Sequence, residues 1–278
     1  MSSNGYDLLL KAEDVSKRFQ LGQYISLASS LRSLKRMTSN PLTFWRGPER
    51  APTHERWQTH NGSKYLWAVR NVSLEVRRSE RIAILGRNGA GKSTLLKLLV
   101  GIMQPTEGSI WFNARIVPLL GVGAGFDPEL TGRENVHLNA AVLGLDPAQM
   151  RMDEIIDFAE IPEFMDTPLK RYSKGMRARL GVAAALTLSP DILIVDEVLG
   201  VGDMAFRSKC VGRIQEMCGR GMALLFVTHS PGRVKELCER AILMRHGLIV
   251  EDGECGHVVS RYLDEDVGEV AGAKPDIT

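Results

Sequence analysis

The feature that most constrains this chain is a glycine-rich stretch at positions 86–94, which reads GRNGAGKST. The apolar run Arg81–Leu85 precedes it and a second apolar run, Leu95–Val100, follows it. This order predicts a strand, a tight loop and a helix, the context that a phosphate-binding loop of the form GxxxxGK[ST] requires. The glycines let several backbone N–H groups point at one anion, and the helix adds its positive N-terminal end. The stretch therefore predicts a site for a nucleoside triphosphate.

Single positions in this loop have separate expected roles. Lys92 can reach the β- and γ-phosphates, and the hydroxyl of Ser93 can hold Mg²⁺. The alternative, a glycine-rich turn that happens to precede a lysine, does not explain the strand before it and the helix after it. We therefore expect a nucleoside triphosphate and Mg²⁺ as cofactors. The other positions expected to contact the nucleotide are Gly86, Asn88, Gly89, Gly91 and Thr94.

Length and composition exclude several classes of protein. The 278 residues suffice for one large domain, or for one domain with a subdomain. A formal net charge of +2 is too small to make nucleic acid the main partner. The cysteines show no C-x-x-C pair, which indicates buried thiols of a reducing compartment. With no secretion signal, and no apolar run near the ~20 residues that span a bilayer, we expect a cytoplasmic protein.

Two carboxylates follow a strongly apolar run at 191–195. We expect Asp196, at the C-terminal tip of a neighbouring parallel strand, to hold Mg²⁺ directly or through a water. Glu197 is expected to act as general base or to position the water that attacks the γ-phosphorus. The alternative is a strand end that happens to be acidic, and the phosphate loop upstream argues against it.

His229 ends another apolar run, 223–228, which follows the two carboxylates by one predicted helix. A lone histidine is more often a hydrogen-bonded structural residue than a catalytic one. Here, however, the residue falls at the C-terminal edge of the sheet that carries the phosphate site. We therefore expect His229 to be catalytic.

Strands alternate with helices along the chain, which predicts an α/β fold on a mainly parallel sheet. A mainly helical region is expected over 131–188, where Thr131 and Glu134 stand in capping-box positions. A last helix is expected over 257–264 and a disordered tail over 266–278. The predicted strands cover 8–15, 66–76, 81–85, 109–112, 115–120, 191–197, 223–228, 241–244 and 248–250.

Residues 20–64 form an unusual insertion between the first two predicted strands. Its first part places leucines at helical spacing beside basic residues, and its second part is rich in Pro, Arg and Trp without periodicity. One interpretation is a solvated loop. The other is a basic amphipathic element that meets a membrane surface or a membrane-embedded partner. The sequence leaves both open.

The segment Tyr172–Arg177, which reads YSKGMR, resembles the signature motif of ATP-binding-cassette (ABC) ATPases, usually written LSGGQ. The phosphate loop, this motif, the two carboxylates and His229 stand in the family's order, so the resemblance covers about 8–263. It implies a phosphate-loop NTPase core with an antiparallel β subdomain and a helical subdomain. We expect one ATPase domain over 1–265, with the helical subdomain at 126–188.

The resemblance also implies an assembly of two chains. They would pack head to tail around two ATP molecules, with Ser173 and Gly175 of each chain completing the nucleotide pocket of the other. Asp203 matches the loop that runs across the dimer seam. Phe19 matches the aromatic residue that stacks on adenine, with Tyr24 as the alternative.

Two positions depart from the family pattern. The position at which most members of the family carry a glutamine, called the Q-loop, falls near Gly121. Lys174 replaces the usual Ser or Gly of the signature motif.

Residues 123–136, reading GAGFDPELTGRENV, resemble the ABC subfamily that exports O-antigen, capsule, teichoic acid and related lipid-linked glycans. The segments 172–180 and 201–203 and the long insertion fit the same group. The implied function is a peripheral ATPase subunit on the cytoplasmic face of the cell membrane. It would power polysaccharide export through a polytopic permease, which contacts the glycan. The alternatives are an ABC subunit for a different substrate, or a nucleotide-switched regulatory or scaffold ATPase, against which the lack of sustained heptads counts.

Overall fold

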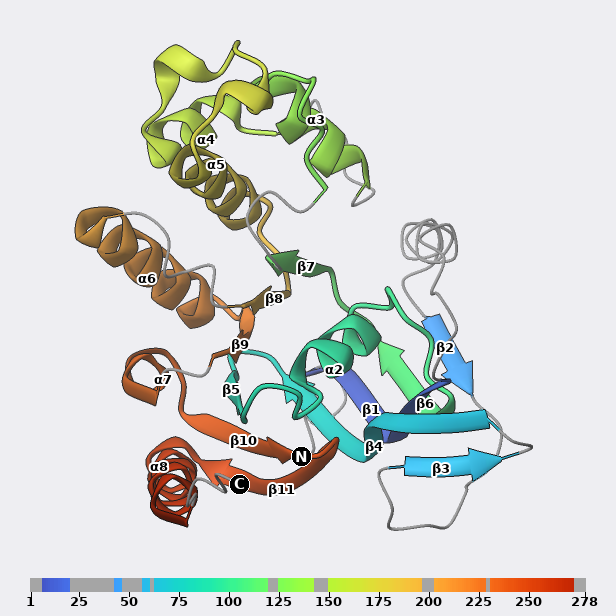
Figure 1. The fold of residues 1–278 in the computed structure, drawn as a ribbon. Coiled ribbons are helices and arrows are strands. Elements are labelled where there is room, and N and C mark those ends of the chain that lie inside the picture. The colour runs from blue at the N-terminus through green and yellow to red at the C-terminus, as the bar shows by residue number, and fades with distance from the viewer. Residues whose placement is uncertain are drawn as a thin grey trace, which may run out of the picture.

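A computed structural model describes residues 7–20, 43–46, 57–60, 63–119, 125–142, 150–196, 203–228 and 231–272. These ranges form two β-sheets, of five and six strands, and a set of helices (Figure 1). The predicted α/β fold with a mainly parallel sheet is therefore confirmed. None of the helices in these ranges is long and apolar enough to cross a membrane.

The antiparallel sheet has the strand order β2-β6-β1-β4-β3. Its centre is the long β1–β4 pair, whose register runs from Leu8 opposite Arg77 to Gln20 opposite Tyr65. Both strands are longer than predicted, because each is paired with a neighbour along most of its length. The strands are β1 (Leu8–Gln20), β2 (Thr43–Arg46), β3 (Trp57–His60), β4 (Ser63–Arg77) and β6 (Glu107–Phe112).

The strands β2 and β3 lie inside the 20–64 insertion, so the interpretation of that whole segment as an irregular loop is wrong for these residues. β2 pairs with β6 and β3 pairs with β4 at the edges of the sheet. Backbone pairing with an existing strand forms them without an alternating side-chain pattern, which is why periodicity gave no signal. The remaining residues of the insertion lie outside the described ranges.

The second sheet has the strand order β11-β10-β5-β9-β8-β7. All its neighbours pair in parallel except β10 and β11, which form an antiparallel hairpin. β9 lies between β5 and β8, so the expectation that Asp196 ends a strand next to the phosphate-loop strand is wrong. Chain order does not fix sheet order, because a helical crossover can skip a position. The strands are β5 (Arg81–Leu85), β7 (Ile116–Leu119), β8 (Ile192–Val195), β9 (Ala223–Val227), β10 (Arg240–Arg245) and β11 (Leu248–Glu254).

The parallel sheet is covered on both faces, as its continuous apolar strands require. Ile82 and Ile84 of β5 join the core that contains α2 (Lys92–Leu99) and the antiparallel sheet. Ala83 and Leu85 point the other way, toward a core built by the helices α5 (Lys174–Thr187), α6 (Met204–Gly219), α7 (Pro231–Leu237) and α8 (Cys255–Gly272). Because side chains alternate between the two faces of a strand, β5 contributes residues to two separate cores.

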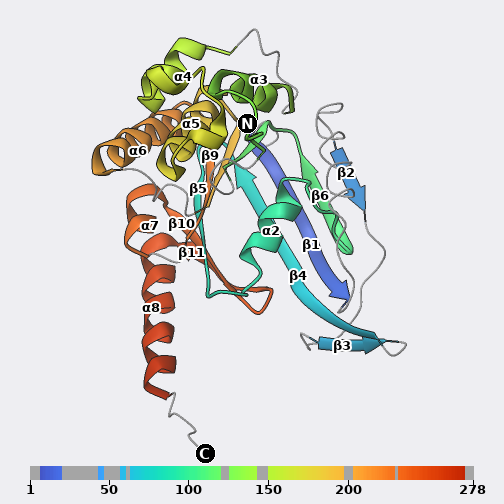
Figure 2. The ribbon, with the colours of Figure 1, turned by 45° about the horizontal axis from the view of Figure 1, so that its top comes forward.

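The helices α3 (Gly132–Val142), α4 (Met152–Ala159) and α5 form a cluster apart from α2 in both views (Figures 1 and 2). They share a small hydrophobic core that includes Val136, Ile155 and Leu180. Two 3₁₀ turns, at Pro162–Phe164 and Leu169–Arg171, join α4 to α5. The predicted helical region is thus confirmed, as is its capping box: Glu134 accepts hydrogen bonds from the Thr131 N–H and hydroxyl, both at 2.8 Å.

The last helix is longer than expected. α8 runs over Cys255–Gly272, so the predicted disordered tail is wrong for residues 266–272. An acidic composition disfavours burial but not a helix, and residues added to an existing helix avoid the unfavourable nucleation step. Residues 273–278 lie outside the described ranges.

The cysteines provide a test of this packing. All four are free and buried. Burial raises the pKa of Cys210 to about 12 and that of Cys218 to about 11, and it also raises the pKa of Cys238 and Cys255. Because the thiolate is the reactive form, we expect almost no reaction with iodoacetamide at pH 8 in the native state. Intact mass should show four alkylated thiols only in denaturant, and rapid native labelling would contradict the packing described here.

Candidate nucleotide site

The phosphate loop connects β5 to α2, as its sequence predicts, and two of its glycines are required by close backbone contacts. Gly86 has φ 146° and Gly91 has φ 107°. A Cβ atom at Gly86 would lie 2.4 Å from the carbonyl oxygen of Met244 in β10. One at Gly91 would lie 2.3 Å from the carbonyl oxygen of Ala68 in β4. No other residue type fits either position without moving backbone.

The turn between β10 and β11 is hydrogen-bonded to the phosphate loop. The backbone N–H of Gly247, in the β10–β11 turn, donates to the carbonyl of Ala90 at 2.8 Å. The carbonyl of Gly247 accepts from the N–H of Arg70 in β4, also at 2.8 Å. We call this backbone connection of β4, the hairpin turn and the phosphate loop the loop clamp. The predicted strands at 241–244 and 248–250 flank this turn, but no sequence pattern indicates that the turn contacts the loop.

The N-terminal end of α2 is suited to bind an anion. Its N-cap, Gly91, has no side chain to occupy the first N–H groups, and its first turn contains no acidic residue. The Lys92 ammonium donates to the carbonyls of Gly86 at 2.5 Å and Arg87 at 3.1 Å, which holds it over the loop. Ser93 is exposed beside it. Backbone N–H groups, a helix N-terminus and a cation therefore converge on one place.

The structure also describes the remaining loop positions. Asn88 and Gly89 are exposed on the loop, and Gly89 has φ 78°. Thr94 is half-buried in the first turn of α2.

Asp196 directly follows β8 at the same sheet edge, and its N–H donates to Leu119 at 3.3 Å. β9 separates it from β5, so two strand spacings, about 10 Å, lie between the two strands. The sequence did not single out Thr228, a buried residue at the end of β9 between the two.

The oxygen donors available fit Mg²⁺. The Ser93 hydroxyl and the Asp196 carboxylate are hard ligands of the kind that this ion prefers, alongside water and phosphate oxygens. Among the residues that the structure describes, no group of three or more His, Cys, Asp or Glu side chains could hold a metal by itself. Glu197, His229, Tyr24 and Gly121 lie outside the described residues, so the predictions for them stay predictions.

Phe19 lies near the end of β1, opposite Leu66 of β4, two residues before the Ala68 carbonyl that contacts Gly91. That Phe19 stacks on adenine stays a prediction. The Lys17 ammonium lies 5.7 Å from the centre of the Phe19 ring and donates to the carbonyl of Gln104 at 2.8 Å. Burial lowers the pKa of Lys17.

The signature motif forms the start of α5, away from the phosphate loop of the same chain (Figures 1 and 2). Ser173 is the N-cap and accepts a hydrogen bond from the Met176 N–H at 3.1 Å. Among the described residues, a Cβ atom at Gly175 would meet only the Ser173 hydroxyl, at 3.8 Å. Contacts within that part of the chain therefore do not require a glycine at 175.

Asp203 is the N-cap of α6, and its Oδ1 accepts from the Phe206 N–H at 2.9 Å. Its Oδ2 accepts from the Nη2 of Arg179, in the signature helix, at 2.5 Å. The Phe206 N–H and the Arg179 charge hold the pKa of Asp203 below its ordinary value. No sequence pattern pointed to Arg179, which is separated from Asp203 by 24 positions.

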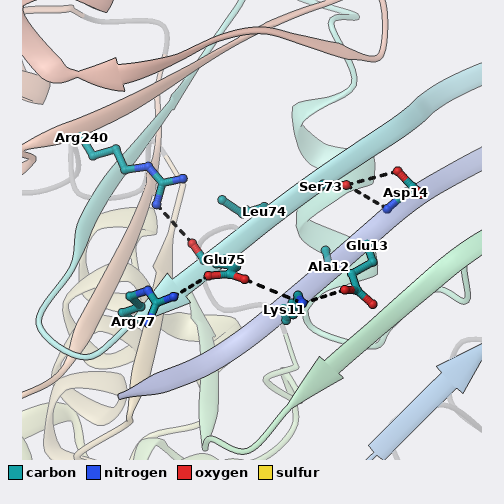
Figure 3. Close-up of a pocket in the computed structure, with 9 residues that line it drawn as sticks. All are labelled: Lys11, Ala12, Glu13, Asp14, Ser73, Leu74, Glu75, Arg77 and Arg240. Carbon is teal, nitrogen blue, oxygen red and sulfur yellow. Dashed lines mark hydrogen bonds and ion pairs between the residues drawn. The ribbon is translucent and has the colours of Figure 1, made fainter. Parts of the chain in front are cut away.

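A surface cavity of about 660 Å³ lies elsewhere, across β1 and β4 beside Arg240 (Figure 3). It is at the end of β4 far from Ala68, and its charges are paired with one another: Lys11 with Glu13 at 2.7 Å, and Arg77 with Glu75 at 2.6 Å. It has neither a glycine loop nor a helix N-terminus, so it is not the nucleotide site. Its lining consists of Lys11, Ala12, Glu13, Asp14, Ser73, Leu74, Glu75, Arg77 and Arg240.

Fold and site together define a phosphate-loop NTPase: a covered parallel sheet, a glycine loop entering a helix, and an aspartate at the same sheet edge. Comparison with known proteins makes this class more specific. A family model described as "ABC transporter" matches residues 69–200.

Over 208 residues the chain is 45% identical to the O-antigen export system ATP-binding protein RfbB of Klebsiella pneumoniae, covering 74% of this chain and 84% of that protein. It is 42% identical over 199 residues to the teichoic acids export ATP-binding protein TagH of Listeria innocua, covering 71% and 59%. A dimeric post-hydrolysis ATP-binding cassette bound to ADP and phosphate has the same fold, with TM-score 0.65 and 20% identity over 89% of this chain and 99% of that one. The chain belongs to the ABC transporter family and is one of its ATPases.

The loop clamp predicts the effect of a methyl group at position 91. Gly91→Ala should destabilise the nucleotide-free protein by about 2 kcal/mol or more, because the residue has φ 107° and its Cβ would meet the Ala68 carbonyl. Urea unfolding measures this change. Gly212→Ala is the matched control, since a Cβ atom at that exposed glycine in α6 would meet none of the described residues within 4 Å. It should leave stability unchanged or raise it by up to about 1 kcal/mol. Equal stability of the two variants would contradict the clamp.

Proposed function

We propose that this chain is the ATP-hydrolysing subunit of an exporter that moves a lipid-linked polysaccharide across the cytoplasmic membrane. Two observations together support the proposal. The N-terminus of α2 has no side-chain cap and can bind a phosphate, and the chain is similar over most of its length to proteins named for O-antigen and teichoic acid export. The chain would act on the cytoplasmic face of the membrane, bound to a polytopic permease that contacts the glycan. Nucleic acid has no part in this proposal.

The residues of the site divide the chemistry among them. The N–H groups of the loop and of α2, with Lys92, stabilise negative charge on the β- and γ-phosphates. Ser93 and Asp196 would hold Mg²⁺, which supplies further charge neutralisation at the same phosphates. Glu197 would accept a proton from the attacking water, and His229 would contact the γ-phosphate. Phe19 would stack on adenine.

The second half of the site would come from another copy of the chain. The helix α5, which Ser173 caps, lies apart from α2 in both views (Figures 1 and 2), which supports a role for the signature motif at a nucleotide bound by another chain. The open space at Gly175 supports a close approach by a phosphate group from outside the chain. In a head-to-tail homodimer, with Asp203 at the seam, each signature helix would cover the nucleotide of its partner. ATP would close this dimer and hydrolysis would open it.

The homodimer and the role of Glu197 are tested by one pair of variants. Glu197→Gln should retain ATP binding but lose hydrolysis by about 10²–10⁴-fold, because the general base is gone. With Mg-ATP it should elute as a dimer in size-exclusion chromatography. Lys92→Ala is the control and should bind ATP weakly and remain monomeric. Normal turnover by Glu197→Gln would remove this residue from the role of base, and a strictly monomeric Glu197→Gln protein, even with its permease present, would refute the shared site.

Export is tested in cells of the source organism that lack this gene. We expect lipid-linked polysaccharide to accumulate inside these cells and to disappear from their surface, as measured by glycan extraction and surface labelling. The wild-type gene should restore the surface glycan, and the Glu197→Gln gene should not. An unchanged surface glycan would refute the proposal. A defect in solute uptake or drug resistance would then indicate another transported substrate, and a defect in repair or translation would indicate a regulatory ATPase.

A further inference from the structure

The residue before Ser173 is a tyrosine, whereas the signature motif of the family is usually written with a leucine there. The Tyr172 hydroxyl donates to the carbonyl of Phe164 at 2.6 Å, and only 3% of the residue is exposed. Burial raises the pKa of Tyr172 to about 12, so the hydroxyl stays protonated and remains a donor. The two aromatic rings meet edge to face, with 6.3 Å between their centres. A leucine could not form this hydrogen bond, so the contact is specific to the tyrosine.

Gly132, the first residue of α3, leaves the space that the hydroxyl occupies. A Cβ atom at this position would lie 2.4 Å from the Tyr172 oxygen, and 3.2 and 3.3 Å from the carbonyl oxygen and the sulfur of Met165. Gly132 does not have a positive φ, so its backbone conformation does not require a glycine. The oxygen of Tyr172 is therefore the main reason why a larger residue does not fit at position 132.

The loop before α3 is held against the same part of the chain. Asn135 is fully buried, and its side-chain amide donates to the carbonyls of Asp127 and Leu130 at 2.9 and 3.1 Å. Its side-chain oxygen accepts from the Asp127 N–H at 2.6 Å. The Leu130 carbonyl also accepts from the N–H of Leu169, at 2.9 Å, and Leu169 begins the 3₁₀ turn whose C-cap is Tyr172. The side chain of Tyr172 and the backbone before it are thus both fixed to the start of α3.

These contacts determine where the signature helix begins. Tyr172 is the C-cap of the 3₁₀ turn and Ser173 is the N-cap of α5, so no residue separates the two elements. The Ser173 hydroxyl is itself fixed, because it accepts from the Met176 N–H at 3.1 Å. A displacement of the Tyr172 ring would therefore displace Ser173 and the first turn of the helix with it.

We propose that Tyr172 is a positioning residue for the signature motif: its hydroxyl, seated between Gly132 and the Phe164 carbonyl, fixes the turn from which Ser173 would meet a nucleotide bound by a partner chain. This inference rests on the proposed function of the signature motif. The hydroxyl of Tyr172 sets the geometry of this turn and does not touch the nucleotide.

The first test is Tyr172→Phe, which removes the hydroxyl and leaves the Phe164 carbonyl without this donor. The kcat for ATP hydrolysis should fall about tenfold, since a displacement near 1 Å can have effects of up to about 10²-fold. The affinity of the monomer for ATP, measured by titration with a fluorescent ATP analogue, should stay within about twofold, because the phosphate loop lies on another element. Tyr262→Phe is the matched control. It removes the hydroxyl of another buried tyrosine, in α8, and its kcat should stay within about twofold of wild type.

The second test adds a methyl group on the other side of the same contact. Gly132→Ala should lower kcat to a similar extent, because its Cβ would displace the Tyr172 oxygen. Combined with Tyr172→Phe, it should lower kcat less than about twofold further, because the oxygen that it would meet is gone. Gly212→Ala again serves as the control for an added methyl group, and its kcat should stay within about twofold of wild type.

Three results would overturn the inference: an unchanged kcat for Tyr172→Phe, full multiplication of the two losses in the double variant, or a weakened affinity of the Tyr172→Phe monomer for ATP. If Gly132→Ala does not fold, Tyr172→Phe and its control decide the question. A wild-type protein without ATPase activity would refute the proposed function, whereas an active wild type with a fully active Tyr172→Phe variant would refute this inference alone.

Discussion

The nucleotide site depends on a backbone contact between two sheets. Gly91 begins α2 against the Ala68 carbonyl of the antiparallel sheet, and Gly247 links that strand to the loop from the other side. Without these contacts the loop N–H groups would have no fixed direction, because glycines allow many conformations. The chain thus obtains a rigid anion site from residues that are individually the most flexible.

The sequence predicted the parts of the site that are built from local chemistry. The loop, its flanking strand and helix, and the capping box of α3 each depend on residues within a few positions of one another. Steric rules, helix-end hydrogen bonds and apolar periodicity act over that range and leave a readable pattern. The family resemblance added the order of the motifs along the chain.

The features that the sequence did not predict depend on contacts between distant segments. The apolar run before Asp196 does not indicate that β9 will lie between its strand, β8, and the phosphate-loop strand β5. Strand order depends on how the crossover connections pack. The short strands β2 and β3 form through pairing with partners far along the chain. The Arg179–Asp203 contact also joins distant segments. In the sequence these are two ordinary charged residues, and they meet only because the fold places α5 beside α6.

The hairpin of β10 and β11 acquires a function beyond that of completing a sheet. Its turn donates to Ala90 and accepts from Arg70, so the length of this hairpin sets where the phosphate-binding backbone stands. A residue inserted in this hairpin would shift the backbone of the phosphate loop, although the insertion would lie more than 150 positions downstream of the glycine motif. The geometry of the nucleotide pocket therefore depends on a hairpin that directly precedes the C-terminal helix.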